Sequence, residues 1–380
     1  MAELWTVEHV EHDGTVINTI APENLQFTFN KKPPHTMQYE VSLARSDLIT
    51  HDFIGAYRTN FHLVRGGQRI MGGLHTEISV GLNDDFCTVF GKDWYHYIER
   101  RQFPYDPRLG HRFDYQIGSP AMGIAYETNS ADVTEIIWQL AQKIFGRPNS
   151  LDISFDYIHT HPVGIATSFS MALGDTSYLG QFIDTLSEVY PGFMYEVTQD
   201  RLFRIYSPTR YNPGVATDSS LAAYIIDDAH SNAIIDLTFS NAGPDATHLF
   251  GHGQGIGQNL IGSALGAPAN QAIYYRLDND FDLGTATQSA GTDRTKREFM
   301  RMLNPQHEVV LIVDPDKLAD FWNTVHCGTA IWINKDLVAH QIDSPQEVVQ
   351  MDCTVSNEGD EQVIFGLEQI YEGTVGVAEG

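Results

Sequence analysis

Residues 24–44 read "NLQFTFNKKPPHTMQYEVSLA" and give the clearest indication of the fold class. The first half of this stretch alternates apolar and polar side chains and places Leu25, Phe27 and Phe29 on one face. "KKPPHT" interrupts the alternation, which resumes with a second apolar face formed by Met37, Tyr39, Val41 and Leu43. A period of two residues is typical of strands that bury one face, so the stretch predicts a pair of antiparallel strands.

Strand-like patterns continue in other parts of the chain. "NFHLV" (60–64), "RIMGGLHTEISVGL" (69–82) and "FCTVF" (86–90) read as strands, and Gly66 and Gly67 can supply the positive φ of a tight hairpin. Residues 1 to about 105 are therefore expected to form an all-β unit. The C-terminal part returns to β structure in "HEVVLIVDP", "TAIWIN", "LVAHQID" and "EVVQMDCTVSNEGDEQVIFGLEQIY". In this last hairpin we expect residues 357–360 to form the turn and one face to carry Val349, Met351, Cys353 and Val355.

The middle of the chain is mixed. After an N-cap at Ser130, "ADVTEIIWQLAQKIF" predicts a helix with one apolar stripe, formed by Val133, Ile136, Ile137, Leu140 and Ile144. "YLGQFIDTLSEVY" (178–190) predicts a second helix, and a hairpin turns at Gln199-Asp200. We also expect a strand at 233–240, a glycine-rich loop at 251–266 and a helix at 293–303.

Composition limits the function. The chain has 380 residues, with 49 acidic and 23 basic side chains and a formal charge of -26, which disfavours binding to duplex DNA or to anionic membranes. Cys87, Cys327 and Cys353 show no CxxC spacing, so we expect three buried free thiols. No stretch is long enough for a membrane span and the N-terminus has no leader pattern, so we expect synthesis and assembly in a cytoplasm.

One motif suggests metal chemistry. In "DYIHTHPVGIATSFSMALGD" (156–175), His159 and His161 fall on one strand face, where two imidazoles could share a zinc ion. The start resembles the JAMM metalloprotease motif, which needs a serine and an aspartate eight and eleven residues after the second histidine. Phe169 and Ala172 stand at those positions.

The remaining candidates for that site do not complete it. Ser170 and Asp175 are off register, and nothing in the sequence selects Glu127 as the activating base. A catalytic zinc site needs a third protein ligand. We therefore expect no metal at His159 and His161, and expect "HTHP" to end a strand.

Other catalytic patterns fail at specific positions. "FGHGQGIGQNLIG" (250–262) has no glycines at relative positions 1, 3 and 6 of a dinucleotide fingerprint, and no lysine follows as in a P-loop. Ser263 lacks the GxSxG context. Carboxylate groups at Asp227-Asp228 and at 278–282 lack the spacing of a calcium loop, so a solvated face is expected there. We thus expect no catalytic residues and no cofactor.

Aromatic residues interleave with basic ones in "KDWYHYIERRQFPYDPR" (92–108). Such a stretch could stack on single-stranded nucleic acid or on sugar. The alternative, which the acidic charge of the chain favours, is a strand edge facing the core. A carbohydrate-binding surface using "WYHY" (94–97) and Trp332 stays open as a third interpretation.

The order β unit, α+β insertion, partial β unit, insertion, β unit resembles the baseplate hub proteins of phage tail tips, especially the minor tail proteins of siphophages. The resemblance rests on texture and spacing over nearly the whole chain. It is carried by "IAPENLQFTFNKKPPHTMQYEVSLA", "VRGGQRIMGGLHTEIS", "DVTEIIWQLAQKIFG", "GDTSYLGQFIDTLSEVYPGFMYEV", "IIDLTFSNAGPDATHLFGHGQG" and "GTAIWINKDLVAHQIDSPQEVVQMDCTVSNEGDEQVIFGLE".

The resemblance implies a mainly β fold with α+β insertions: two tail-tube-like β-barrel domains plus two inserted peripheral domains. The first barrel would be 1–110, the first insertion 111–208, and the second barrel 209–247 with 308–372. A second insertion would cover 248–307, and 373–380 would be a flexible tail. The chain ends soon after the closing β domain, so we expect no wall-cleaving region.

The resemblance also implies a function. Three copies would form a homotrimeric hub in the virion that continues the tail tube and passes DNA without binding it specifically. Its partners would be the distal tail protein ring, the tape measure protein and tail-tip or fibre proteins. The alternatives are a hexameric distal tail adaptor, a glycan-binding tail protein, or a zinc hydrolase using His159 and His161.

Overall fold

The structure is a computed structural model of the chain. It describes residues 4–44, 56–81, 84–101, 124–145, 151–156, 166–172, 178–187, 193–206, 219–241, 243–253, 262–268, 275–284, 307–337 and 340–370, and isolated positions between 271 and 303. Among these residues no helix is both long and apolar enough to cross a bilayer.

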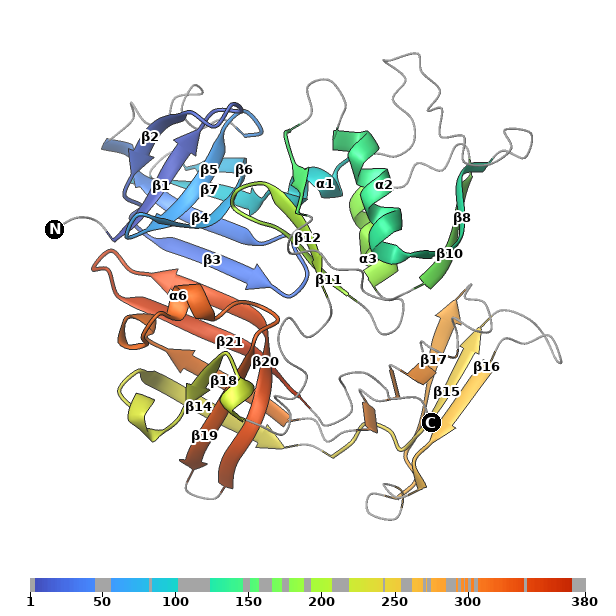
Figure 1. Ribbon diagram of the computed structural model, residues 1–380. Helices are drawn as coiled ribbons and strands as arrows, with labels where there is room; N and C mark the ends of the chain where they lie inside the picture. Colours follow the sequence, from blue (N-terminus) through green and yellow to red (C-terminus); the bar gives the residue numbers. More distant parts are fainter. Residues whose placement is uncertain are drawn as a thin grey trace.

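Seven strands form what we call the first β unit, at the upper left of Figure 1. They are β1 (Trp5–Val10), β2 (Val16–Ile20), β3 (Leu25–Asn30), β4 (Thr36–Ser42), β5 (Asn60–Arg65), β6 (Gln68–Val80) and β7 (Phe86–Asp93). The predicted alternation is confirmed, because Leu25, Phe27, Met37, Tyr39 and Val41 are all buried. Gly66 and Gly67 turn the β5–β6 hairpin with φ of 55° and 87°.

The second β unit lies below the first in Figure 1 and is assembled from distant segments. Its strands are β13 (Tyr224–Ile226), β14 (Ile234–Asn241), β18 (His307–Val313), β19 (Ala330–Leu337), β20 (His340–Val355) and β21 (Glu361–Gln369). A short helix, α6 (Phe321–Thr324), precedes β19. The predicted strand "LVAHQID" is divided: Leu337 ends β19, residues 338–339 lie outside the described residues, and residues 340–343 begin β20. The predicted strand "EVVQMDCTV" is also part of β20.

Both β units belong to one hydrogen-bonded sheet. The strand order is β14-β18-β21-β20-β3-β4-β7-β6-β5-β1-β2, with β19 and β13 joined beside β20. The connection is made by β3 and β20, which run antiparallel from Leu25 opposite Val355 to Asn30 opposite Gln350. One hydrophobic cluster continues across this pair and includes Phe27 and Tyr39 from the first unit and Leu311 and Phe365 from the second.

The predicted face of β20 needs one correction. The pairing with β21 shifts register between Val348 and Gln350, so one extra residue is accommodated there. Such a bulge changes which residues face the core. As a result Val348 is fully buried with Met351 and Cys353, while Val349 is only partly buried.

The first insertion, at the upper right of Figure 1, is α+β as predicted. It contains α1 (Tyr95–Glu99), β8 (Ile124–Asp132), α2 (Val133–Phe145), β9 (Ser154–Phe155), β10 (Ala166–Ala172), α3 (Leu179–Ser187), β11 (Met194–Val197) and β12 (Leu202–Tyr206). The predicted cap is wrong: Ser130 lies in β8, and the Thr134 N–H donates to Asp132 Oδ1 at 2.8 Å. The Asp132 side chain therefore caps α2.

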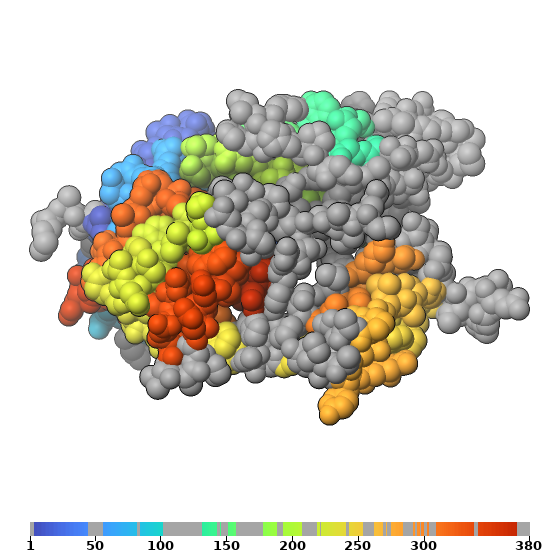
Figure 2. Space-filling view, turned by 60° about the horizontal axis from the view of Figure 1, so that its bottom comes forward, coloured from blue at the N-terminus to red at the C-terminus, as the bar shows by residue number. Residues whose placement is uncertain are grey.

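The second insertion is a three-stranded sheet in the order β16-β15-β17. Its strands are β15 (His248–Gly253), β16 (Gly262–Gly266) and β17 (Asp278–Gly284). The predicted glycine-rich loop, 251–266, is thus wrong at both ends, because Gly251, Gly253, Gly262 and Gly266 lie within paired strands, while its middle lies outside the described residues. Gly251 is required there, since a Cβ atom would meet the Thr295 side chain at 2.5 Å. Figure 2 shows this sheet, gold and orange, at the opposite end of the visible face from the second β unit.

The fold class is confirmed as mainly β with inserted α+β structure. All three cysteines are free and buried, as predicted. The predicted domain boundaries near residues 110 and 208, and the tail 373–380, lie outside the described residues.

Candidate functional site

One continuous surface is the outward side of the shared sheet, which we call the polar face. It crosses both β units over β14, β18, β21, β20, β3, β4, β7 and the second half of β6. Its side chains are Asp236, Thr238, Val310, Ile312, Gln362, Ile364, Glu368, Glu347, Gln350, Asp352, Thr354, Gln26, Thr28, Asn30, Thr36, Gln38, Glu40, Thr88, Phe90, Lys92, Glu77 and Ser79.

The polar face follows from the same alternation that builds the core. Residues that stand opposite one another in an antiparallel pair point to the same side of the sheet. Phe27 stands opposite both Cys353 and Met37, and all three are buried. Their neighbours along each strand must therefore point outward.

Side-chain hydrogen bonds run across the polar face at the junction of the two units. The Thr28 hydroxyl donates to Asp352 Oδ1 at 2.7 Å, and Gln350 Nε2 donates to Asp352 Oδ2 at 2.8 Å. Gln38 Nε2 donates to Gln26 Oε1 at 2.7 Å. These bonds fix the polar side chains against the sheet.

The polar face is acidic. Carboxylates come from Glu40, Glu77, Asp236, Glu347, Asp352 and Glu368, and Lys92 is the one basic side chain in the set. Lys31, just beyond β3, lies 2.8 Å from Glu347 and 3.9 Å from Glu368. Burial raises the pKa of Glu347, and Lys31 opposes that shift. The surface can repel phosphate while offering amides and hydroxyls to water.

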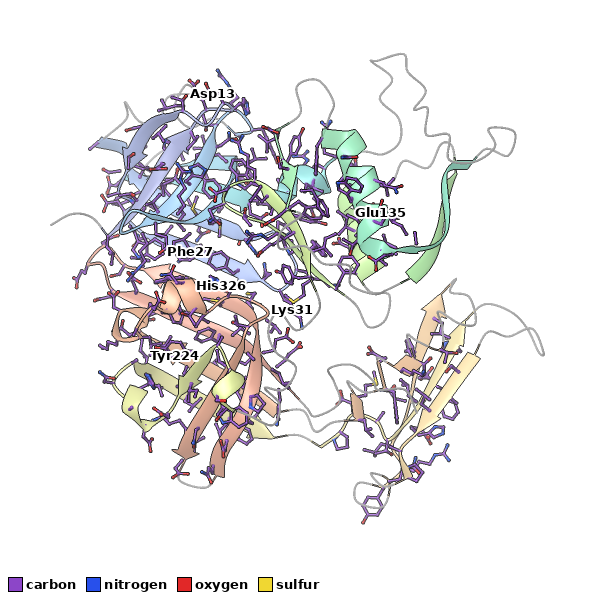
Figure 3. All side chains as sticks on the ribbon, viewed as in Figure 1. Asp13, Phe27, Lys31, Glu135, Tyr224 and His326 are labelled. Atoms are coloured by element: carbon purple, nitrogen blue, oxygen red, sulfur yellow. The ribbon has the colours of Figure 1, made fainter. Side chains whose placement is uncertain are left out.

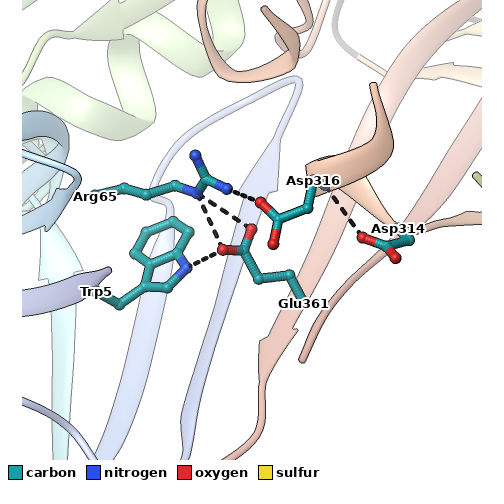
Figure 4. A network of polar contacts seen from close by, with 5 residues as sticks. All are labelled: Trp5, Arg65, Asp314, Asp316 and Glu361. Carbon is teal, nitrogen blue, oxygen red and sulfur yellow. Dashed lines mark hydrogen bonds and ion pairs between the residues drawn. The ribbon is translucent and has the colours of Figure 1, made fainter. Parts of the chain in front are cut away.

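A second polar cluster, the junction cluster, lies at the junction between the two units (Figure 4). Trp5 Nε1 donates to Glu361 Oε1 at 2.7 Å, and Arg65 Nε lies 3.1 Å from the same oxygen. Arg65 also pairs with Asp316. The rings of Trp5 and Trp322 meet edge to face at 5.4 Å beneath the guanidinium group. Burial raises the pKa of Glu361, while the hydrogen bonds from Arg65 and Trp5 lower it.

A third cluster, the histidine cluster, lies inside the first β unit, and its members His9, Tyr39, His75 and Thr59 are joined by hydrogen bonds without an ion pair among them. His9 Nε2 is 2.9 Å from the Tyr39 hydroxyl, which is 3.1 Å from His75 Nε2. His75 Nδ1 is 3.0 Å from the Thr59 hydroxyl. Burial lowers the pKa of His9 to about 4 and that of His75 to about 3, so both rings are neutral at pH 7.

The predicted metal candidates are only partly described. His159, His161 and Asp175 lie outside the described residues. The β8–β10 pairing places Ser170 opposite Glu127, two residues that the sequence did not connect. The expectation that no metal binds at His159 and His161 stays a prediction.

The aromatic stretch belongs mostly to the core. Trp94 and Tyr95 are 0% and 1% exposed, so they cannot present rings to a sugar or a base. The Trp94 N–H donates to the Gln199 carbonyl at 3.1 Å, and the Arg201 guanidinium stacks on the Trp94 ring at 4.6 Å. The expectation that these rings face the core is therefore correct, but the expected strand edge is wrong, because Tyr95–Glu99 form the helix α1 after β7 ends at Asp93. Trp332 donates to Asp343 at 2.7 Å.

The aspartates at 278–282 lie where a solvated face was expected. Asp278, Asp280 and Asp282 are all exposed on β17. His248 and His252 of the neighbouring strand lie 3.4 and 3.7 Å from Asp278 and Asp280. No group of three or more potential metal ligands occurs among the residues that the structure describes.

No protein-family model and no curated protein matches this sequence. Solved structures do match. A 43 kDa tail protein of prophage MuSo2 from Shewanella oneidensis superposes with a TM-score of 0.64 at 11% identity, covering 96% of this chain and 97% of that chain. The chain has the fold of a phage tail protein.

Two further structures agree with this fold. A tail protein from Neisseria meningitidis MC58 gives a TM-score of 0.60 at 12% identity, with 97% of each chain covered. The prophage tail protein gp18 from Listeria monocytogenes EGD-e gives 0.58 at 10% identity, covering 95% of this chain and 94% of that chain. The sequence resemblance to phage tail proteins is thus confirmed at the level of the fold.

Proposed function

We propose that the chain is a structural component of a phage tail tip and assembles as a homotrimer around a channel for DNA. The observation that carries this proposal is the single sheet that joins both β units and presents one acidic polar face. A surface that large, polar and regular has the properties expected of a channel wall.

The free edges of the sheet support a ring. Among the described strands, β14 pairs only with β18, and residues 77–80 of β6 pair only with β7. Ile235 of β14 is 49% exposed and Val80 of β6 is 51% exposed. Unprotected edges invite pairing with another chain, and a closed ring removes them. We propose that β14 of one copy joins the second half of β6 of the next.

The chemistry of the polar face suits passage without binding. Proteins that hold DNA do so with clusters of Lys and Arg, which release counterions from the phosphates. The polar face instead combines six carboxylates with amides and hydroxyls. DNA would therefore slide along it without being retained.

The proposed role in the virion and the proposed partners rest on the similarity of the fold. An E. coli component of the type VI secretion system, described as structurally similar to T4 tail proteins gp27 and gp5, superposes with a TM-score of 0.51 at 9% identity, covering 94% of this chain and 76% of that chain. We propose that this chain is a hub in the virion, without enzymatic activity. Its insertions would face the distal tail protein ring, the tape measure protein and tail-tip or fibre proteins.

Light scattering on the purified protein tests the ring. We expect a mass three times that of the 42.5 kDa chain. Ile235→Lys or Val80→Lys should give monomers that fold normally, because a charge at a free edge blocks strand pairing. Val16→Lys, at the 41% exposed residue of the other end of the sheet, is the control and should remain trimeric. A wild-type monomer would contradict the proposal, and six copies would favour a distal tail adaptor.

A further inference from the structure

The two β units repeat one order of strands. In the first unit neighbouring strands follow the order β3-β4-β7-β6-β5-β1, and in the second they follow β14-β18-β21-β20-β19-β13. The first five strands of each series are antiparallel to their neighbours within the series. The sixth strand differs in direction, because β1 is antiparallel to β5 whereas β13 is parallel to β19. Five strands of one unit therefore have counterparts in the other.

A bulge in each unit fixes which residues correspond. The pairing of β6 with β7 shifts register between His75 and Glu77, and the pairing of β20 with β21 shifts register between Val348 and Gln350. The half of the strand before the bulge pairs with β5 in the first unit and with β19 in the second. Because a bulge inserts one extra residue at a defined point, aligning the two bulges equates Glu77 with Gln350. The residues that follow on β6 and β20 then correspond one by one.

The same correspondence extends to the edge strands β3 and β14. Residues that stand opposite one another on successive strands are His75, Gly91, Met37 and Phe27 in the first unit, and Val348, Leu367, Val309 and Phe239 in the second. Phe239 of β14 is therefore the counterpart of Phe27 of β3. The next residue on each strand makes Ser240 the counterpart of Thr28.

The two edge strands differ in their neighbours. β3 lies beside the second half of β20, where Phe27 stands opposite Cys353. The counterpart of Cys353 is Val80, in the second half of β6. Among the described strands, however, β14 pairs only with β18, and residues 77–80 pair only with β7. One chain thus contains one complete junction between the units and the two separate halves of a second.

Burial differs between the complete junction and these two halves. Phe27, labelled in Figure 3, and Cys353 are each 2% exposed. Val80 is 51% exposed, and Phe239 is partly buried. Removing apolar surface from water stabilises folds and interfaces alike. A strand that joined β6 to β14 would therefore cover apolar surface at Val80 and Phe239, as the β3–β20 pair already does at Phe27 and Cys353.

We propose that the junction between copies repeats the β3–β20 junction residue for residue. β14 of one copy runs antiparallel to the second half of β6 of the next, with Phe239 opposite Val80 and Ser240 opposite Ser79. This inference rests on the proposed ring and adds the register in which a second copy of this chain occupies each edge. A shift by one residue would pair Phe239 with an outward-facing position, because successive side chains point to opposite faces of a sheet.

Disulfide formation between copies tests this register. Ser79 and Ser240 are both exposed and lie on β6 and β14, which are not neighbours within one chain, so a bond between them should join two copies. Oxidation of Ser79→Cys/Ser240→Cys should give covalent dimers and trimers. The control Ser79→Cys/Thr238→Cys moves one cysteine two residues along the same face and should cross-link at least about tenfold more slowly, because disulfides need close Cα atoms. Cys87, Cys327 and Cys353 are buried and unchanged in both variants.

The outcomes separate the register from the ring. Faster cross-linking of the Thr238→Cys variant would overturn the register and leave the ring, as would no cross-linking of a protein that light scattering shows to be trimeric. A monomeric wild type would overturn both. If the cysteine variants do not fold, hydrogen exchange of the wild type decides. Residues 77–80 and 237–240 should exchange at least about tenfold more slowly than Val16–Ile20 of the edge strand β2, and equal exchange would overturn the pairing.

Discussion

The junction cluster and the histidine cluster are two ways of burying polar groups in one hydrophobic core. At the junction, Arg65 and Glu361 bring opposite charges together beneath two tryptophans. Inside the first β unit, His9 and His75 share hydrogen bonds with Tyr39 and remain uncharged. The difference suggests distinct roles: the charged cluster fixes how two units meet, and the neutral cluster fills the interior of one unit. It also means that the two clusters should respond differently to mutation and to pH.

The largest expected effect is the loss of an aromatic ring from the junction. Trp5 is 5% exposed and its ring lies 5.1 Å from that of Phe27. Trp5→Ala should lower the free energy of unfolding by about 3–5 kcal/mol, since it removes packing and the donor to Glu361. Urea unfolding at fixed protein concentration measures this. Trp332→Ala, at a partly exposed ring, is the control and should cost less than about 1 kcal/mol; equal losses would mean that Trp5 has no special place in the core.

Low pH should destabilise the fold through the histidine cluster. The pKa of His9 is about 4 in the fold, against about 6.5 in an unfolded chain, so the unfolded state binds more protons between these values. Stability is therefore complete above pH 6.5 and falls as the pH drops toward 4, by about 3 kcal/mol for His9 alone. The pKa of His75, about 3, gives the same sign.

A carboxyl group opposes this trend and must be separated from it. The pKa of Asp93 is raised to about 7, so it stabilises the fold at low pH and loses that contribution as the pH rises from about 4 to 7. Urea unfolding between pH 4 and 7 should therefore show a shallower acid loss for His9→Gln, and a steeper one for Asp93→Asn, than for the wild type. An unchanged slope in His9→Gln would contradict a buried neutral imidazole.

We expect the more buried carboxylate of the junction cluster to contribute more to the free energy of unfolding. Glu361 is 4% exposed and bonds to both Trp5 and Arg65, whereas the Asp316 side chain is 48% exposed. Glu361→Gln should cost about 2 kcal/mol, because Arg65 loses its buried partner. Asp316→Asn removes the exposed partner of the same arginine and should cost less than about 1 kcal/mol. Denaturation of both variants checks this order, and the reverse order would show that the buried pair does not hold the junction.

The smallest effect concerns the pairing of β3 with β20. Thr28→Val removes the hydroxyl that donates to Asp352 and should cost about 1 kcal/mol. Thr36→Val changes an exposed residue of β4 that makes no bond across this pair and should stay within about 0.5 kcal/mol. Thermal unfolding distinguishes the two, and identical behaviour would indicate that the polar face contributes nothing to joining the units.

The alternation of apolar and polar residues predicts most strands, but it does not predict which strands pair with one another. The alternation predicts β3 and β4 because each strand buries one face, which carries Leu25, Phe27, Met37 and Tyr39. Nothing local indicates that Phe27 pairs with Cys353, since a contact between residues so distant in sequence depends on the whole topology. The sequence therefore does not predict the polar face as one continuous surface. It does predict that alternate residues such as Gln26 and Thr28 point away from the core.

The errors have identifiable physical causes. Ser130 and Asp132 are both good caps, and the continuation of β8 to Asp132 decides between them. Val349 was misplaced because a bulge shifts the strand by one residue. The glycines of β15 and β16 suggested a loop, yet at Gly251 the absence of a side chain permits close packing within a sheet.

The trimeric ring can be seen by electron microscopy of the purified protein, viewed along its symmetry axis. We expect a threefold ring around an open channel, with Thr28, Gln38 and Asp352 on the inner wall. A ring with these residues on its outer surface, or particles without threefold symmetry, would contradict it.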